Sequence, residues 1–302
     1  MLLSVVNKKM KGNLIDRLFL CGEVWKVSFK SMWQCPAIFL PFAFIALCEM
    51  ILLGILLLAP HPIMEPLLGP PIKRFFGEMF LHYPYNFSLL PTLFEYVSLP
   101  LTLVLMPLMC AVTVGMTSFV VNGEKADLGK NLGLSIKKYV PSFFLRIIVL
   151  LIYIGIFMLL KFLALQCYPP ALAKILHIPS WRMLTICQYL SLFICLLVEP
   201  FLAYAIPIMI LEKKKLFSAI KEGIIVGWSM YLPTIVIIAV PALFGACVVL
   251  VKQKMLSFFV NLLPESVLGV MACGFILSLF IGVLITTSLT ILFLIKRQNI
   301  NE

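Results

Sequence analysis

Apolar residues in this chain gather into long, nearly uninterrupted segments, separated by shorter segments in which charged and apolar positions alternate with a helical period. A helix needs about 20 residues to cross a hydrocarbon core of ~30 Å. The segments that reach this length lie near residues 36–59, 94–121, 141–166, 183–211, 233–251 and 267–294. These segments are too long and too uniformly apolar for barrel strands, and a backbone in lipid must satisfy its own hydrogen bonds. We therefore expect an all-α integral membrane protein with six transmembrane helices.

The segments before the first, third and fifth spans are amphipathic. Apolar residues recur on one helical face of each: Leu18, Trp25, Phe29 and Met32 in the first, Leu128, Leu132, Ile136 and Val140 in the second, and Leu216, Ile220, Ile224 and Trp228 in the third. Each segment runs into a proline, at positions 36, 141 and 233. Proline suits the first turn of a helix, where its missing N–H would have no partner anyway. The pattern predicts a helix lying in the headgroup plane, followed by a spanning helix.

The recurrence of this joint predicts a threefold pseudo-repeat within a single membrane domain, residues 1–302. The units run over about 14–121, 122–211 and 212–295. Each unit has a cytoplasmic amphipathic helix and a hairpin of two spans, and internal repeats of this kind indicate a repeated structural unit. The alternative, that similar interface chemistry arose three times without common ancestry, stays open.

Two joints carry a resemblance. GEKADLGKNLGLSIKKYVPSFF and EKKKLFSAIKEGIIVGWSMYLPTI are similar to the joints of a loose group of prokaryotic six-span families. That group includes the membrane domain attached to some glycerophosphodiester phosphodiesterases, together with uncharacterised relatives. The similarity is one of pattern and covers about residues 14–295. It implies the architecture and a link to membrane lipid or envelope processes. The soluble phosphodiesterase domain has no counterpart in this sequence, so the resemblance does not imply its chemistry.

Composition strengthens the membrane assignment. Hydrophobic residues make up 62% of the chain, charged residues 12%, and the mean hydropathy is +1.09. A soluble domain usually has about 25% charged residues. The net charge of +11 comes from short basic runs between apolar segments. This arrangement is typical of contact with anionic lipid and argues against a nucleic-acid partner.

The basic residues also predict the orientation. They concentrate on one side of the predicted spans, where the candidate lipid-contacting residues are Lys26, Lys30, Lys137, Lys138, Lys213, Lys214, Lys215 and Lys221. Cytoplasmic loops are enriched in Lys and Arg. We therefore expect both termini in the cytoplasm, in a prokaryotic inner (plasma) membrane, with anionic lipids at the cytoplasmic face.

Two glutamates fall deep inside predicted spans. Glu49 lies in the first and Glu199 in the fourth, where Pro200 and Pro207 weaken the helix. Buried carboxyl groups are costly in lipid and often mark binding sites, and broken spans often line cavities. One hypothesis is that both glutamates face one cavity that binds a cation, a proton or a cationic head group. The alternative is that each is protonated and bonded to a neighbouring helix.

Other polar residues are weaker candidates. Arg146 and Lys161 lie near span ends, where long side chains extend to the interface. The three histidines lack the spacing that would fix metal ligands on one face, so we predict neither a metal site nor a cofactor.

The sixth span carries small residues at four-residue intervals: Gly274, Ser278, Gly282, Thr286 and Thr290. Small side chains at this spacing let helix backbones approach closely. We expect tight helix packing through Gly274, Ser278 and Gly282.

Two functions remain open at this point. The chain has no P-loop, HExxH or GxSxG motif, so we expect no enzyme. The intramembrane glutamates and the interrupted fourth span favour binding or transport of an amphiphilic or lipid-like solute. The lysine-rich joints suit the alternative, a membrane scaffold or an accessory subunit of an envelope complex that docks a protein partner.

Overall fold

The computed structural model describes residues 14–167, 180–262 and 264–301, and helices are the regular elements throughout these ranges. In chain order they are α2 (Leu14–Gln34), the short 3₁₀ helix η1 (Pro36–Phe39), α3 (Leu40–Leu57), α4 (Glu65–Phe75), the 3₁₀ helix η2 (Glu78–Leu81), α5 (Tyr85–Val121), α6 (Leu128–Lys137), α7 (Tyr139–Cys167), α9 (Ser180–Leu202), α10 (Ala205–Leu211), α11 (Leu216–Ser229), α12 (Tyr231–Leu262) and α13 (Ser266–Asn301).

Five helical segments of the described chain are long and apolar enough to cross a membrane: Pro36–Leu57, Tyr85–Val121, Tyr139–Ala164, Ile186–Leu211 and Ser266–Gln298. The pair α11–α12 supplies a sixth when it is counted as one bent unit, with a bend of 92° between Leu216–Ser229 and Tyr231–Cys247. The predicted all-helical architecture is therefore confirmed, and five or six of its helices have the length and composition to span a membrane.

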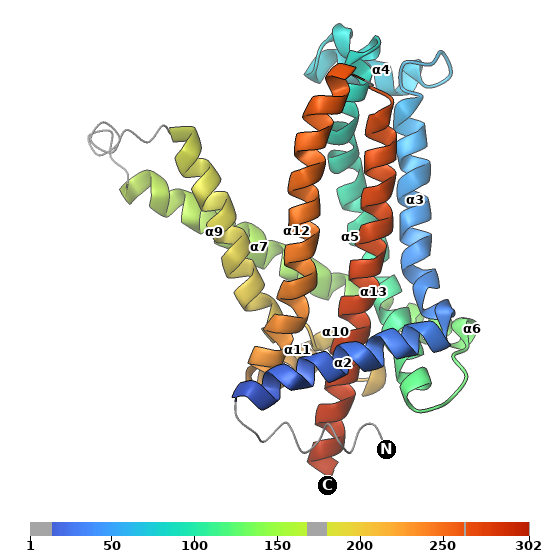
Figure 1. Ribbon diagram of the computed structural model, residues 1–302, viewed down its shortest axis with the longest axis vertical. Helices are drawn as coiled ribbons and strands as arrows, with labels where there is room; N and C mark the ends of the chain where they lie inside the picture. Colours follow the sequence, from blue (N-terminus) through green and yellow to red (C-terminus); the bar gives the residue numbers. More distant parts are fainter. Residues whose placement is uncertain (1–13, 168–179, 263, 302) are drawn as a thin grey trace.

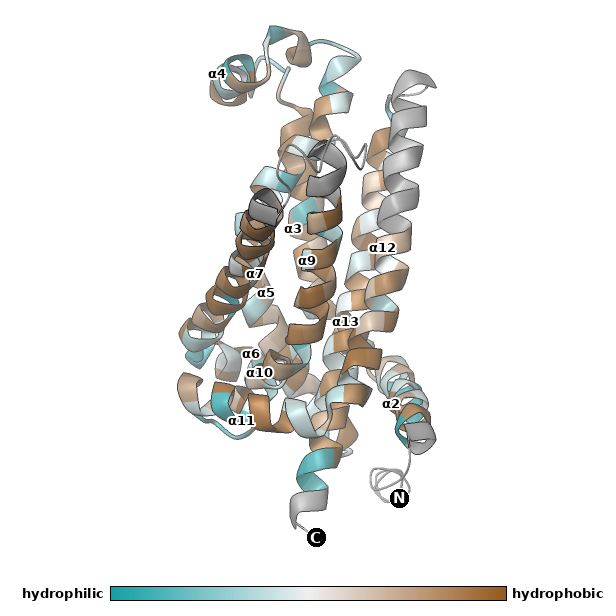
Figure 2. Ribbon diagram, turned by 90° about the vertical axis from the view of Figure 1, so that its left-hand side faces the viewer, coloured by the Kyte–Doolittle hydropathy of each residue, from teal (hydrophilic) through white to brown (hydrophobic). Residues whose placement is uncertain are grey.

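The long helices and the short ones occupy different parts of the molecule. α3, α5, α12 and α13 run along the long axis as a bundle, while α7 and α9 lean away from it (Figure 1). α2, α6 and α11 gather at the end where the chain terminates, and α4 caps the opposite end. Figure 2 shows hydrophobic residues along the spans and hydrophilic residues near these two ends.

The three prolines lie at helix starts, as expected. Pro36 is the first residue of η1, and Pro141 and Pro233 are each the third residue of their helices, α7 and α12. In these first turns a proline removes no helical hydrogen bond.

The helices α2, α6 and α11 turn small or polar residues toward the bundle. The buried small or polar residues are Ser28 and Ser31 of α2, Asn131 and Ser135 of α6, and Ala219, Gly223 and Gly227 of α11. α2 also buries Leu20, Cys21, Val24 and Met32. The predicted apolar stripe of α6 is instead exposed along its length, as are Leu18 and Phe29 of α2 and Trp228 of α11. In water such a distribution would be unfavourable, whereas it suits helices whose outer apolar side chains meet lipid.

Hydrogen bonds hold α2 across the bundle. The Ser28 and Ser288 hydroxyl oxygens lie 2.9 Å apart, which joins α2 to α13. The Cys21 thiol donates to the carbonyl of Pro233 at 3.7 Å, which joins α2 to the start of α12. Burial raises the pKa of the Cys21 thiol to about 11.

Some boundaries differ from the sequence-based expectation. α5 begins at Tyr85 instead of near residue 94, and α12 continues to Leu262 instead of ending near 251. Hydropathy marks where a helix is apolar, and a helix continues past the apolar window wherever its backbone stays hydrogen-bonded.

Candidate functional site

A cavity of about 240 Å³ lies among α5, α7, α9–α10 and α13. Most of its lining is aliphatic, and its polar or titratable lining residues are Cys110, Arg146, Tyr153, Glu199 and Thr286. Each helix contributes one face, at intervals of one or two turns. The cavity lies toward the end of the molecule occupied by α6 and α11, since it is lined by the second half of α5 and the first half of α7.

The interrupted fourth span forms one wall of the cavity. α9 ends at Leu202 and α10 begins at Ala205, so the break predicted from the two prolines is present. Pro207 has no N–H to donate to the carbonyl of Ala203, one turn earlier, and its ring crowds that carbonyl. Glu199 lies in the last turn of α9, and residues on both sides of the break line the cavity. Glu199 and the break therefore belong to the same wall of the cavity.

α11 lies directly against this break. A Cβ atom added at Gly227 would overlap the carbonyl oxygen of Pro200 and lie 3.0 Å from the Cα of Phe201. A Cβ added at Gly223 would lie 3.3 Å from the backbone nitrogen of Ala205. The four-residue spacing of these glycines is a signal of close helix packing that the sequence analysis did not use, although it used the similar spacing in the sixth span.

Arg146 comes from the start of α7. The Tyr139 hydroxyl donates to the Val104 carbonyl at 3.2 Å and fixes α7 against α5. Leu145 is buried in the core, whereas its neighbour Arg146 is exposed and lines the cavity. Within the segment Tyr139–Ala164, only 6% of the most apolar 18 residues are buried inside the protein. Arg146 therefore lies at the mouth of the cavity, on a helix that is largely open to lipid.

Arg146 and Glu199 face the cavity from different spans without pairing directly. The guanidinium is close enough for its charge to act on the Glu199 carboxyl. Even so, none of the ion pairs among the described residues joins the two side chains. A guanidinium stays charged in proteins. Charged groups within a bilayer mark ion or substrate sites when they face an internal cavity.

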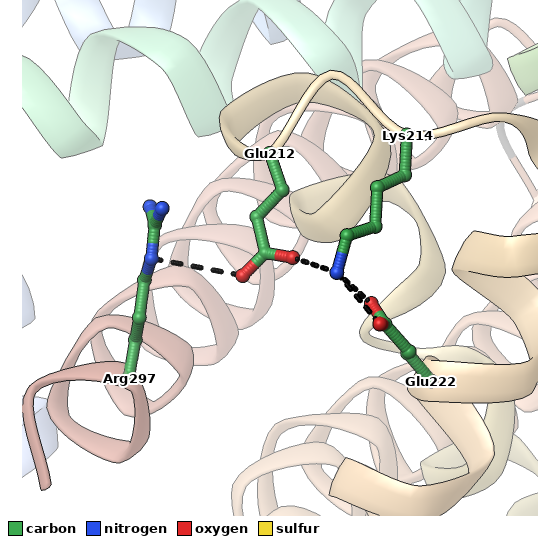
Figure 3. Close-up of polar contacts among 4 residues, drawn as sticks. All are labelled: Glu212, Lys214, Glu222 and Arg297. Atoms are coloured by element: carbon green, nitrogen blue, oxygen red, sulfur yellow. Dashed lines mark hydrogen bonds and ion pairs between the residues drawn. The ribbon is translucent and has the colours of Figure 1, made fainter. Parts of the chain in front are cut away.

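A cluster of ion pairs joins α11 and α13 to the loop between α10 and α11 (Figure 3). The ammonium of Lys214 lies 2.8 Å from Glu212 and 2.6 Å from Glu222, and Arg297 of α13 lies 3.6 Å from Glu212. Hydrogen bonds to Glu212 and then Glu222 raise the pKa of Lys214. Lys138 donates to the carbonyls of Lys213 and Lys214, at 3.0 and 3.3 Å. The cluster ties the α10–α11 loop to α11, to α13 and to the α6–α7 joint.

The predicted lipid-contacting lysines thus divide into two groups. Lys138 and Lys214 are half-buried in the contacts just described. The exposed ones are Lys26, Lys30, Lys137, Lys213, Lys215 and Lys221.

The other residues predicted to form the site differ in their relation to Arg146 and Glu199. Glu49 is half-buried on α3 and is not among the residues that line the cavity. Pro200 is buried beside Glu199, with its carbonyl toward α11. The cap formed by α4 and η2 has its own small core around Ile72 and Leu81, and contributes no residue to the cavity.

The small residues of α13 lie in different surroundings. Gly282 lines the cavity, and a Cβ added there would lie 2.6 Å from the Phe42 ring of α3. Thr286 also lines the cavity, while Gly274 is half-buried and Ser278 is exposed. Gly282 therefore has the close helix contact that the sequence predicts.

Comparison with known proteins gives no match: no family model, no curated protein and no solved structure is similar to this chain.

Proposed function

We propose that this multi-pass membrane protein binds an amphiphilic or lipid-like solute in the cavity between α5, α7, α9–α10 and α13. One observation carries the proposal: Arg146 and Glu199, from separate spans, line the same cavity without pairing with each other. The lining around them is otherwise mainly aliphatic. A ligand with charged and apolar parts satisfies both kinds of lining. The proposed role is binding or transport and involves no catalysis.

The proposal includes an orientation in the membrane. α2, α6 and α11 lie in the cytoplasmic headgroup plane of a prokaryotic inner membrane, with both termini in the cytoplasm. The exposed apolar stripe of α6 and the exposed lysines of all three helices support this placement, since apolar residues face acyl chains and lysines face anionic lipid. The three helix–proline–hairpin units, in this view, are repeats of one ancestral unit. The resemblance of the joints to the membrane domain of certain phosphodiesterases contributes only this architecture.

Transport is the more specific form of the proposal. The α7–α9 hairpin leans away from the bundle, and α9–α10 is interrupted where it lines the cavity (Figure 1). A weakly packed hairpin and a broken span are the elements that can move to open a cavity.

The alternative is a membrane scaffold or accessory subunit. It is favoured by large side chains that stand out from the short helices: Trp33 is 89% exposed, Phe217 80% and Trp228 74%. Aromatic side chains of this kind serve protein interfaces as well as lipid contacts. Under this alternative, Arg146 and Glu199 stabilise the bundle and bind no ligand.

Native mass spectrometry of protein released from lipid-preserving particles tests the proposal. The wild type should retain one ligand of lipid-like mass per chain, and the Arg146→Gln, Glu199→Gln double variant should lose it. Glu49→Gln is the matched control, since it removes a span carboxyl group outside the cavity and should leave the ligand bound. Equal retention by the double variant would contradict the proposal. A protein subunit that copurifies with all variants, without any small ligand, would favour the scaffold.

A further inference from the structure

We propose that the ligand carries a phosphate-type anion and a primary ammonium group, as a phosphoethanolamine head group does. This inference rests on the proposed function and names the chemistry of the ligand. Arg146 binds the phosphate, Glu199 binds the ammonium, and the acyl chains of the lipid form extend along α7.

Arg146 suits the anionic end. Its planar guanidinium presents paired N–H donors that match two phosphate oxygens. It lies seven residues beyond Tyr139, or about 10 Å along the helix at ~1.5 Å per residue. Arg146 is exposed as well as cavity-lining, so a ligand arriving from the lipid meets it first.

Glu199 suits the cationic end. It is half-buried on α9 and lines the same cavity, and a carboxylate accepts hydrogen bonds from an ammonium group. The hydroxyl of Thr286 on the same cavity offers a further acceptor. Tyr153 is the one aromatic side chain among the described lining residues. A quaternary ammonium, as in choline, is typically held by a cage of several aromatic rings. The lining therefore favours a primary ammonium.

The dimensions fit a head group without its chains. The cavity volume of about 240 Å³ lies just below the ~300–1,000 Å³ of typical small-molecule pockets, so it suits a head group and not a whole lipid. Acyl chains need a place outside the cavity. On α7, Leu151 is 61% exposed, Met158 56% and Phe162 56%, which provides an apolar surface that begins near Tyr153 and continues toward the end of the helix. The cavity lies toward the α6–α11 end, so the lipid would come from that leaflet.

The test uses the full chain in nanodiscs that contain equal amounts of phosphatidylethanolamine, phosphatidylglycerol and phosphatidylcholine, with the retained lipids identified by native mass spectrometry. The wild type should retain phosphatidylethanolamine at least tenfold over either other lipid. Glu199→Gln should lose about tenfold of the preference over phosphatidylglycerol, because only the ammonium contact is weakened. Arg146→Gln should lose both phosphatidylethanolamine and phosphatidylglycerol, and Glu49→Gln should behave as wild type.

The possible outcomes separate the two proposals. A wild type that holds phosphatidylglycerol as well as phosphatidylethanolamine overturns the ammonium assignment and leaves amphiphile binding intact. If the wild type retains no phospholipid, the proposed function itself is contradicted. The same holds if both cavity variants retain phospholipid as the wild type does. The order in which the wild type retains the three lipids tests the inference even if a variant fails to fold. Addition of soluble O-phosphoethanolamine distinguishes a lipid ligand from a soluble one with the same head-group chemistry. Displacement of the bound lipid would indicate a soluble ligand, and persistence of the lipid would indicate a lipid ligand.

Discussion

Replacement of Gly227 by alanine should destabilise the protein by forcing α11 away from the break in the fourth span. The added Cβ would overlap the carbonyl oxygen of Pro200 and lie 3.0 Å from the Cα of Phe201. Both neighbours are backbone atoms, so no side-chain rotation relieves the contact. Glu199 precedes Pro200 directly, so a shift of this backbone also moves a carboxyl group that lines the cavity.

The expected magnitude follows from two opposing effects. Overpacking usually costs about 1–3 kcal/mol, and contact with fixed backbone favours the upper end. Alanine gains about 1 kcal/mol over glycine in a helix interior. The net loss in the free energy of unfolding should therefore be about 2 kcal/mol.

Thermal unfolding in nanodiscs, followed by tryptophan fluorescence, measures the effect against matched controls. Gly22→Ala in α2 and Gly133→Ala in α6 add a Cβ that has no other atom within 4 Å. These variants should be neutral or slightly stabilised. Gly223→Ala, with its closest backbone contact at 3.3 Å, should fall in between. An unfolding midpoint for Gly227→Ala equal to that of Gly22→Ala would refute the packing of α11 on the fourth span.

Three further predictions concern the ion pairs of Glu212, the docking of α2 and the orientation in the membrane. Glu212→Gln should lower the thermal midpoint at low salt and have less effect at high salt, because these half-exposed ion pairs are screened. The pKa of Lys214 is raised in the folded protein, so its ion pairs contribute fully to stability below the ordinary lysine pKa of about 10.4. This contribution is lost as the pH rises through the raised pKa. The effect of Glu212→Gln on the thermal midpoint should therefore be constant from pH 6 to about 9. In a variant that retains Cys21 as its single cysteine, the thiol should react with maleimide at pH 8 far more slowly than a cysteine at an exposed position of the same helix. The reason is that burial raises the pKa of the Cys21 thiol to about 11. Equal rates would contradict the docking of α2. Cysteines introduced in 61–90 should be labelled by an impermeant reagent from outside and those in 124–138 should not, and the opposite pattern would reverse the proposed orientation.

The spans were predictable because lipid imposes one rule along the whole chain. The first span, expected over 36–59, is Pro36–Leu57, and the fourth, expected over 183–211, is Ile186–Leu211. Each apolar run must form a helix, and its length is set by the bilayer. Local sequence therefore contains the necessary information.

The cavity was less predictable because it depends on which helices meet. Glu199 and the break beside it were evident from sequence. Arg146 was assigned to the interface on account of its position near a span end, yet it lines the same cavity. The expected companion of Glu199 was Glu49, which lies on α3 away from the lining. Depth in a span can be read from one helix, whereas the direction of a side chain follows from the packing of several.

The packing glycines illustrate the same limit. The four-residue pattern in α13 and the spacing of Gly223 and Gly227 in α11 are equivalent as sequence. In the structure Gly227 meets backbone, Gly282 meets the Phe42 ring, and Ser278 is exposed. Small residues permit close approach, but the neighbour that makes use of it lies elsewhere in the chain.

The most direct test of the central claim is an experimental structure of the protein in phosphatidylethanolamine-containing nanodiscs, bound to an antibody fragment to aid image alignment. The account predicts density for one head group that bridges the guanidinium of Arg146 and the carboxylate of Glu199, with its chains along α7. A cavity closed by a direct ion pair between Arg146 and Glu199, with lipid only on the outer surfaces of the bundle, would contradict it.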